Sequence, residues 1–141
     1  MKRFSAETSI NAPPEAVWRV LADVANWAKW DPGTDAAEGV VEKGGELIFR
    51  STQSPGQSLK VRLTAVDEPY LLEWTGGVPR AFTTLRTHRV TPDGDQASSV
   101  EVSEELAGAL LPVIQKQIPD IEGMLDEFLE GLKKRVERGS A

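Results

Sequence analysis

Cysteine is absent from the sequence, and histidine and tyrosine each occur once among its 141 residues. The missing thiols exclude structural disulfides, thiolate zinc sites and a cysteine nucleophile. With His88 as the single histidine, a metal site would depend on carboxylates, and these are not clustered at ligand spacing. No phosphate-binding loop, dinucleotide fingerprint or serine elbow is present either. We therefore expect no bound metal and no cofactor.

Long hydrophobic runs are also missing, because no uncharged apolar segment approaches the roughly 18 residues of a membrane span. Basic residues are outnumbered 22 to 16 by acidic ones, and the net charge of -6 repels nucleic acid and anionic lipid. We expect a soluble, cytoplasmic protein with neither nucleic acid nor membrane as partner. Its length suits one domain over residues 1–141, as a monomer or weak homodimer.

One basic cluster departs from this acidic balance, namely Lys133, Lys134, Arg135 and Arg138. It falls in the last turns of a predicted helix, where cations favour the negative end of the helix dipole. A docking patch is the alternative explanation.

The first two thirds of the chain are typical of an antiparallel sheet. Apolar and polar residues alternate over residues 3–10, and the pair Pro13–Pro14 then opens a helix predicted to run from about Pro14 to Ala22. A second short helix is predicted over residues 24–29. Turn signals separate further strands predicted at 39–42, 46–52, 59–67, 70–75, 82–91 and 98–104.

The last 30 residues carry one apolar stripe with helical spacing, made of Leu110, Ile114, Ile118, Ile121, Leu125, Phe128, Leu132 and Val136. Pro119 interrupts this pattern, but the apolar phase continues on both sides, so we predict one kinked helix. A helix of this kind needs a large apolar surface, and a curved sheet gripping it leaves room for a cavity. The fold class is therefore α+β, with a curved sheet of about six to seven strands wrapped around a long C-terminal helix.

Three ionisable residues are predicted to face the apolar interior. Arg86 and His88 share a strand face with other inward positions, and Glu104 does the same on the next strand. Buried charges must be paired, so we expect Glu104 to contact Arg86 or His88 across the strands. The cluster is either a structural brace, a polar contact for a ligand, or a catalytic group with His88 as general acid or base.

Aromatic and apolar side chains offer candidate pocket walls. Their broad surfaces line small-molecule sites, although plain core packing is the alternative. The candidate ligand-binding residues are Trp27, Trp30, Phe49, Tyr70, Trp74, Phe82, Ile114 and Ile118.

Two segments resemble the START-like or SRPBCC superfamily. The run from Ile10 to Trp18, followed by Trp27, Trp30 and Asp31–Pro32, is similar to its opening strand and tryptophan-bearing helices. The run from Thr87 through Asp95, then Glu104 to Gly108, is similar to the penultimate hairpin and helix entry of its polyketide cyclase and dehydrase-like members. The resemblance covers nearly the whole chain and implies the helix-grip fold, but it does not choose an activity.

Our leading hypothesis is that the chain binds a hydrophobic or aromatic small molecule, lipids included, between the sheet and the C-terminal helix. One alternative is an enzyme of the polyketide cyclase or dehydratase type that uses His88, Arg86 and Glu104. The other is a co-chaperone-like interaction module that docks through the acidic face of the C-terminal helix.

Overall fold

A computed structural model describes residues 2–52, 56–116 and 120–139, and its main element is a seven-stranded antiparallel sheet. The strands are β1 (Lys2–Ile10), β2 (Thr34–Gly39), β3 (Glu46–Ser51), β4 (Leu59–Asp67), β5 (Leu71–Val78), β6 (Phe82–Pro92) and β7 (Ser98–Ala107). The helices are α1 (Pro14–Leu21), the 3-10 helix η1 (Val24–Lys29), α2 (Leu111–Gln115) and α3 (Ile121–Glu137).

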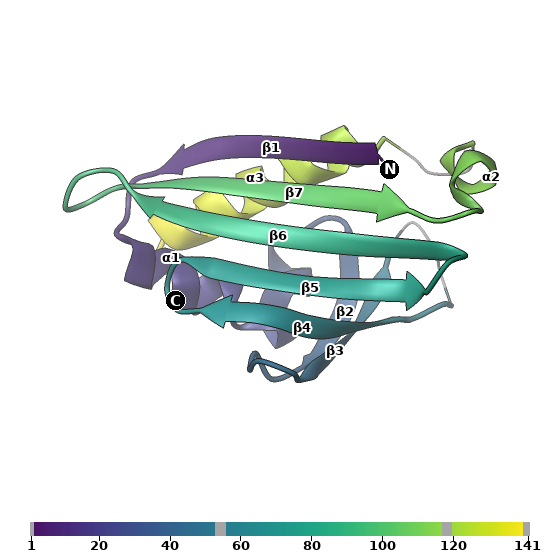
Figure 1. Cartoon of the computed structure of the whole chain (residues 1–141). Helices are drawn as coiled ribbons and strands as arrows, with labels where there is room; N and C mark the ends of the chain where they lie inside the picture. The colour runs from purple at the N-terminus through teal and green to yellow at the C-terminus, as the bar shows by residue number, and fades with distance from the viewer. Residues whose placement is uncertain (1, 53–55, 117–119, 140–141) are drawn as a thin grey trace.

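The sheet is curved, and α1 and α3 lie together behind it in Figure 1. Its strand order is β1-β7-β6-β5-β4-β3-β2, so the first strand joins the last one at one edge. The register shifts in β2 between Thr34 and Ala36 and in β4 between Leu63 and Ala65, and such irregularities bend strands. The predicted α+β helix-grip architecture is confirmed.

The prediction for the second strand was wrong in position. The turn signal that follows it suggested a strand at 39–42, whereas β2 spans Thr34–Gly39 and Val40 is exposed. Gly39 pairs with Leu47 at the end of the β2–β3 ladder and has a φ of 121°, a conformation that favours glycine. Because β2 is an edge strand with much of its surface in solvent, it needs few apolar side chains, and periodicity does not reveal it.

The prediction of one kinked C-terminal helix was also wrong. Helix α2 ends at Gln115, and α3 begins anew after Asp120. The Asp120 carboxylate accepts a hydrogen bond from the backbone N–H of Gly123 at 3.0 Å, which is the arrangement of a helix N-cap. Pro119 itself lies outside the described residues. Figure 1 shows α2 at the far end of the sheet, away from the body of α3.

Among the stripe residues that the structure describes, the buried ones lie in the second half. Leu125, Phe128, Leu132 and Val136 of α3 pack in the core against the sheet, whereas Leu110 beside α2 is exposed. No helix in the described ranges is long and apolar enough to cross a membrane.

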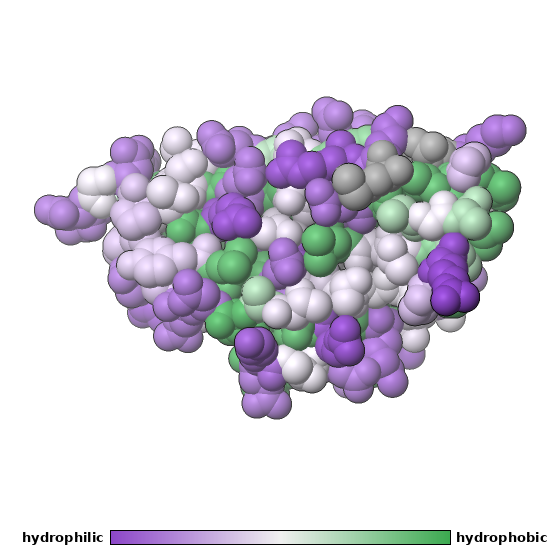
Figure 2. Space-filling model, viewed as in Figure 1, coloured by the Kyte–Doolittle hydropathy of each residue, from purple (hydrophilic) through white to green (hydrophobic). Residues whose placement is uncertain are grey.

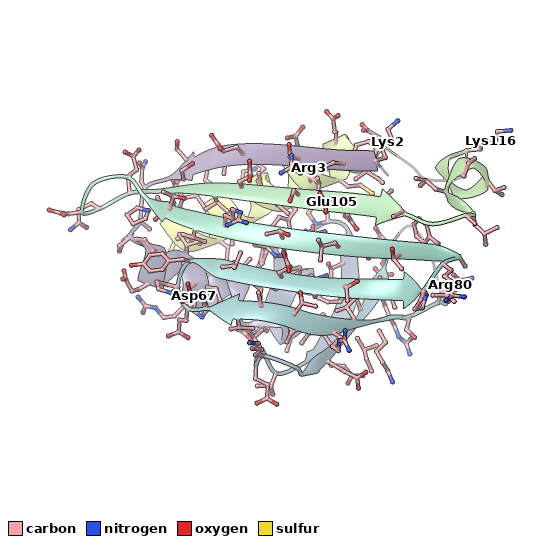
Figure 3. All side chains as sticks on the ribbon, viewed as in Figure 1. Lys2, Arg3, Asp67, Arg80, Glu105 and Lys116 are labelled. Carbon is pink, nitrogen blue, oxygen red and sulfur yellow. The ribbon has the colours of Figure 1, made fainter. Side chains whose placement is uncertain are left out.

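The face of the sheet turned away from α3 has a different composition. Hydrophilic and intermediate residues cover most of it in Figure 2, and hydrophobic ones gather toward the end that carries α2. Arg3 lies within about 4 Å of Glu101 and Glu105 of the neighbouring strand, and Arg3 and Glu105 are labelled in Figure 3. Such exposed pairs contribute little to stability, so the fold depends on the helix-facing side of the sheet.

The first test concerns this helix-facing core. Leu132 is fully buried, so Leu132→Ala should lower the free energy of unfolding by about 2 to 5 kcal/mol. The control Leu110→Ala removes the same atoms at an exposed site and should cost about 0.5 kcal/mol or less. Denaturant unfolding of both variants measures the difference, and equal losses would contradict the packing of α3 on the sheet.

Candidate functional site

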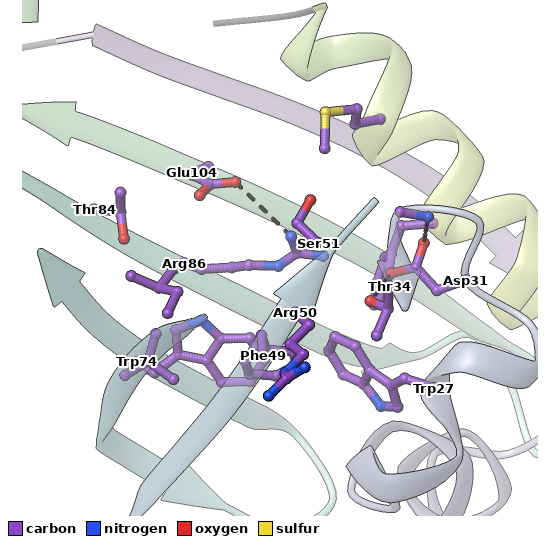
Figure 4. Close-up of a pocket in the computed structure, with 15 residues that line it drawn as sticks. Trp27, Asp31, Thr34, Phe49, Arg50, Ser51, Trp74, Thr84, Arg86 and Glu104 are labelled. Atoms are coloured by element: carbon purple, nitrogen blue, oxygen red, sulfur yellow. Dashed lines mark hydrogen bonds and ion pairs between the residues drawn. The ribbon is translucent and has the colours of Figure 1, made fainter. Parts of the chain in front are cut away.

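A pocket of about 170 Å³ lies between the inner face of the sheet and α3. Figure 4 shows β-strands on one side of it and η1 with the following loop on the other. Its apolar lining consists of Trp27, Phe49, Leu59, Val61, Trp74, Met124 and Phe128. Its remaining lining consists of Asp31, Gly33, Thr34, Arg50, Ser51, Thr84, Arg86 and Glu104. The pocket is thus an apolar space with a few charged and polar groups, as ligand sites usually are.

Aromatic rings form the deep wall of this pocket. The ring of Trp27 lies 5.0 Å from Phe128, 5.4 Å from Phe49 and 5.6 Å from Trp74, measured between centroids. The indole N–H of Trp27 donates a hydrogen bond to the carbonyl of Leu21 at 2.9 Å, so its polar group is satisfied inside the core. The end of α1 therefore fixes the orientation of this indole, and with it the wall of the pocket.

Arg86 and Glu104 meet as the strand pattern predicts. They are direct partners in the β6–β7 ladder, and Arg86 Nη1 lies 3.8 Å from Glu104 Oε2. That distance allows an ion pair but is too long for a hydrogen bond. The guanidinium also lies 4.6 Å from the ring centre of Phe128, which favours a cation over the aromatic face.

His88 lies behind Arg86, and its side chain is fully buried. Its Nε2 accepts a hydrogen bond from Arg86 Nε at 3.0 Å, so the ring proton must sit on Nδ1, which then donates to the carbonyl of Leu72 at 3.1 Å. Burial lowers the pKa of His88 well below its ordinary value, and the charge of Arg86 lowers that pKa further, against the opposing effect of the Leu72 hydrogen bond. His88 is therefore a neutral support for Arg86, and both its ring nitrogens are engaged.

Arg86 keeps unused hydrogen-bonding capacity. Its Nη2 atom is buried and has no hydrogen-bond partner among the described residues. A guanidinium carries five N–H groups, and here only the one on Nε makes a hydrogen bond that the structure describes. Because Nη2 itself is closed to solvent, a molecule in the pocket reaches Arg86 at the exposed part of its side chain, which is 18% of its surface.

Asp31, at the other end of the pocket, is already satisfied by its own loop. Its carboxylate accepts hydrogen bonds from the Gly33 N–H at 3.1 Å and from the Thr34 hydroxyl at 2.7 Å. Among residues 2–52, 56–116 and 120–139, no three acidic or histidine side chains are placed to hold a metal ion. Asp31 is therefore a structural turn residue with one face toward the pocket.

The structure brings together only part of the site predicted from sequence. Trp27, Phe49, Trp74, Arg86 and Glu104 line the pocket, and His88 lies directly behind it.

Three other aromatic candidates do not line the pocket. Tyr70 is 46% exposed in the turn between β4 and β5, so its ring points to solvent rather than inward. Phe82 begins β6 at the far end of the β5–β6 hairpin, and Trp30 packs behind Phe128 at a ring separation of 5.3 Å. The side chain of Ile114 and the whole of Ile118 lie outside the described part of the chain.

The sequence did not identify several of the lining residues as site residues. Thr84 shares its strand face with Arg86, so alternation alone would have identified it. Phe128 was recognised only as a helix core position. Asp31 lies in the loop after η1 and Thr34 begins β2, where no periodic pattern reveals the pocket. Met124 lies on α3 but outside its apolar stripe.

The curved sheet, the gripping helix and the pocket between them define a START-like protein of the helix-grip class. The chain belongs to the polyketide cyclase / dehydrase and lipid transport family, whose model matches residues 1–137. A search among curated proteins found no match.

Solved structures share the fold at low identity. Norcoclaurine synthase from Thalictrum flavum, in complex with dopamine and hydroxybenzaldehyde, is 18% identical, with a TM-score of 0.74 over 99% of this chain and 88% of that one. A START superfamily protein from Mycobacterium smegmatis is 16% identical, with a TM-score of 0.75 over 96% and 97%. The di-domain ARO/CYC protein BexL of the BE-7585A biosynthetic pathway is 20% identical, with a TM-score of 0.75 over 97% of this chain and 47% of that chain.

The neutral state of His88 predicts a pH dependence of stability. Because the pKa of His88 is lower in the folded chain than in the unfolded one, the unfolded state binds the extra proton, and stability must fall as pH drops below about 6.5. The slope can reach about 1.4 kcal/mol per pH unit from this one group.

Urea unfolding between pH 7 and pH 5 measures this slope. Glu137, whose pKa is also lowered, changes its contribution to stability mainly at lower pH than this. His88→Gln should remove most of the slope, and a variant with the wild-type slope would show that His88 is not the responsible group.

Proposed function

We propose that this protein binds a small aromatic molecule that carries a hydrogen-bond-accepting oxygen. The observation that supports this most directly is Arg86, a cation set among aromatic rings in an apolar pocket with unused donors. An unpaired buried donor is costly, so a partner that supplies an acceptor oxygen gains more here than in water.

The size of the pocket favours a ligand with one ring. A volume of about 170 Å³ is close to that of the engineered protein cavity of about 150 Å³ that binds benzene, and below the usual range of drug-sized sites. The rings of Trp27, Phe49 and Trp74 offer the faces and edges against which such a ring packs. Dopamine and hydroxybenzaldehyde, the molecules held by the norcoclaurine synthase of the same fold, are of this size and chemistry.

A second candidate function is catalysis of the cyclase or dehydratase type. It is favoured by the joint presence of Arg86 and Glu104 in the pocket lining, where a guanidinium polarises a carbonyl and a carboxylate moves a proton. The engaged ring nitrogens of His88 give it a positioning role in this scheme, through Arg86, in place of the general acid or base role that the sequence suggested.

The binding test compares two probes of similar shape, acetophenone and isopropylbenzene, which differ in the carbonyl oxygen. Arg86→Met removes the donors and should weaken acetophenone binding by roughly tenfold or more, while isopropylbenzene affinity changes little, because a hydrogen bond to a charged group contributes about 1.5 to 3 kcal/mol. Titration calorimetry measures both affinities. Arg62→Met, on the exposed part of β4, is the matched control and should leave both unchanged.

Glu104→Gln provides a second, independent variant. It removes the carboxylate that competes for Arg86, so acetophenone affinity should rise several-fold in a chain that still folds. Equal losses for both probes in Arg86→Met, or weaker acetophenone binding in Glu104→Gln, would contradict the proposal. Under the catalytic alternative, the Glu104→Gln variant still binds the substrate but no longer turns it over.

A further inference from the structure

A second candidate site lies on the surface around Trp30, outside the ligand pocket. Two depressions of about 300 and 370 Å³ adjoin there and share Lys29, Trp30 and Arg135. The first also contains Gly131, Lys134, Arg138 and Gly139, and the second contains Arg19, Val20, Asp23 and Asn26. We call the combined surface the Trp30 depression.

The Trp30 depression is strongly basic in a protein of net charge -6. Five basic side chains and one acidic side chain line it, which leaves a formal charge of +4. Lys134 pairs with Glu130 at 2.9 Å, but both groups are highly exposed and the pair is weak. Lys29, Arg135 and Arg138 have no ion-pair partner within the described ranges.

Helix dipoles explain part of this basic charge, but not all of it. Arg19, Lys29 and the pair Lys134–Arg135 lie in the last turns of α1, η1 and α3, so the carbonyl ends of three helices meet here. Each end contributes about half a negative charge at most, or about -1.5 in total. The surface therefore retains a charge of about +2.5 that the helix ends do not offset.

Close packing holds the centre of the Trp30 depression in place. A side chain at Gly131 would collide with the Trp30 carbonyl, so glycine allows α3 to approach the backbone at the end of η1. On its inner side, the indole of Trp30 lies 5.4 Å from Trp27 and 5.3 Å from Phe128. The basic side chains thus lie along a depression whose central residue is held by close packing.

We propose that the Trp30 depression binds a phosphate-bearing anion. Guanidinium groups pair with phosphate oxygens in a bidentate manner, and Arg19, Arg135 and Arg138 approach from two different helices while Lys29 adds a point charge. The phosphate belongs either to a soluble phosphate ester or to a lipid headgroup, and the two share this chemistry. The site is independent of the function proposed for the inner pocket.

The test follows the tryptophan indole resonances by NMR during titration with inorganic pyrophosphate at low ionic strength. Trp30→Phe assigns the Trp30 signal, which should move saturably. Arg135→Gln and Lys29→Gln should each weaken the apparent affinity by about fivefold or more, since each removes a charge-assisted contact. The controls Lys60→Gln and Arg62→Gln remove the same charge from β4, where both side chains are exposed, and should have little effect.

A second arm distinguishes the source of the phosphate, using sedimentation with phosphatidylglycerol or phosphatidylcholine vesicles. Saturable pyrophosphate binding that is lost in Arg135→Gln assigns a soluble ligand. Binding to phosphatidylglycerol vesicles alone, with the same dependence on Arg135 and Lys29, assigns a headgroup. The proposal would be overturned if neither pyrophosphate nor phosphatidylglycerol vesicles bind. It would also be overturned if the β4 control variants weaken binding as much as Arg135→Gln and Lys29→Gln do. Thermal melts of each variant check that it is folded.

Discussion

The position of Phe128 is the constraint on which the rest of the site depends. Its ring contacts Trp27 and Trp30 of the η1 segment and His88 of β6, at centroid separations of 5.0 to 5.4 Å, and the Arg86 guanidinium lies 4.6 Å away. One helix side chain therefore joins the sheet, the short helix and the partly buried cation Arg86. Because interiors pack like solids, a shift of α3 would disturb all these contacts together.

The partly buried cation Arg86 shows how this packing is used. A fully apolar interior would be at least as stable, since desolvating a charge can cost more than its pairing returns. The structure instead surrounds Arg86 with partial partners, namely a carboxylate at 3.8 Å, a neutral imidazole at 3.0 Å and an aromatic face. Each partner reduces the cost of burial without using all five N–H groups. In the function we propose, this incomplete satisfaction makes the pocket favour a molecule with an acceptor oxygen over a purely apolar one.

The sequence predicted those parts of the fold that repeat. Alternation in β6 and β7 placed Arg86, His88 and Glu104 on the inner face, and the register confirms that Arg86 and Glu104 are opposite each other. Helical spacing identified Phe128 and Leu132 as core. The parts without repetition were missed or misplaced, including the edge strand β2, the break between α2 and α3, and the place of Asp31 in the pocket lining. Alternation along a strand gives the face on which a residue lies but not its distance from the pocket. It could therefore not show that His88 lies behind Arg86 rather than in the pocket.

Trp30 contributes to two surfaces of the protein at once. Its inner side packs on Phe128, which lines the ligand pocket, and the same residue lines the basic depression outside. Energetic coupling between two sites requires an element with two arrangements that each ligand stabilises differently. The close approach of Gly131 to the Trp30 carbonyl fixes the backbone of this residue, and the aromatic cluster packs against its indole from within. The structure therefore describes one packed arrangement that both surfaces share.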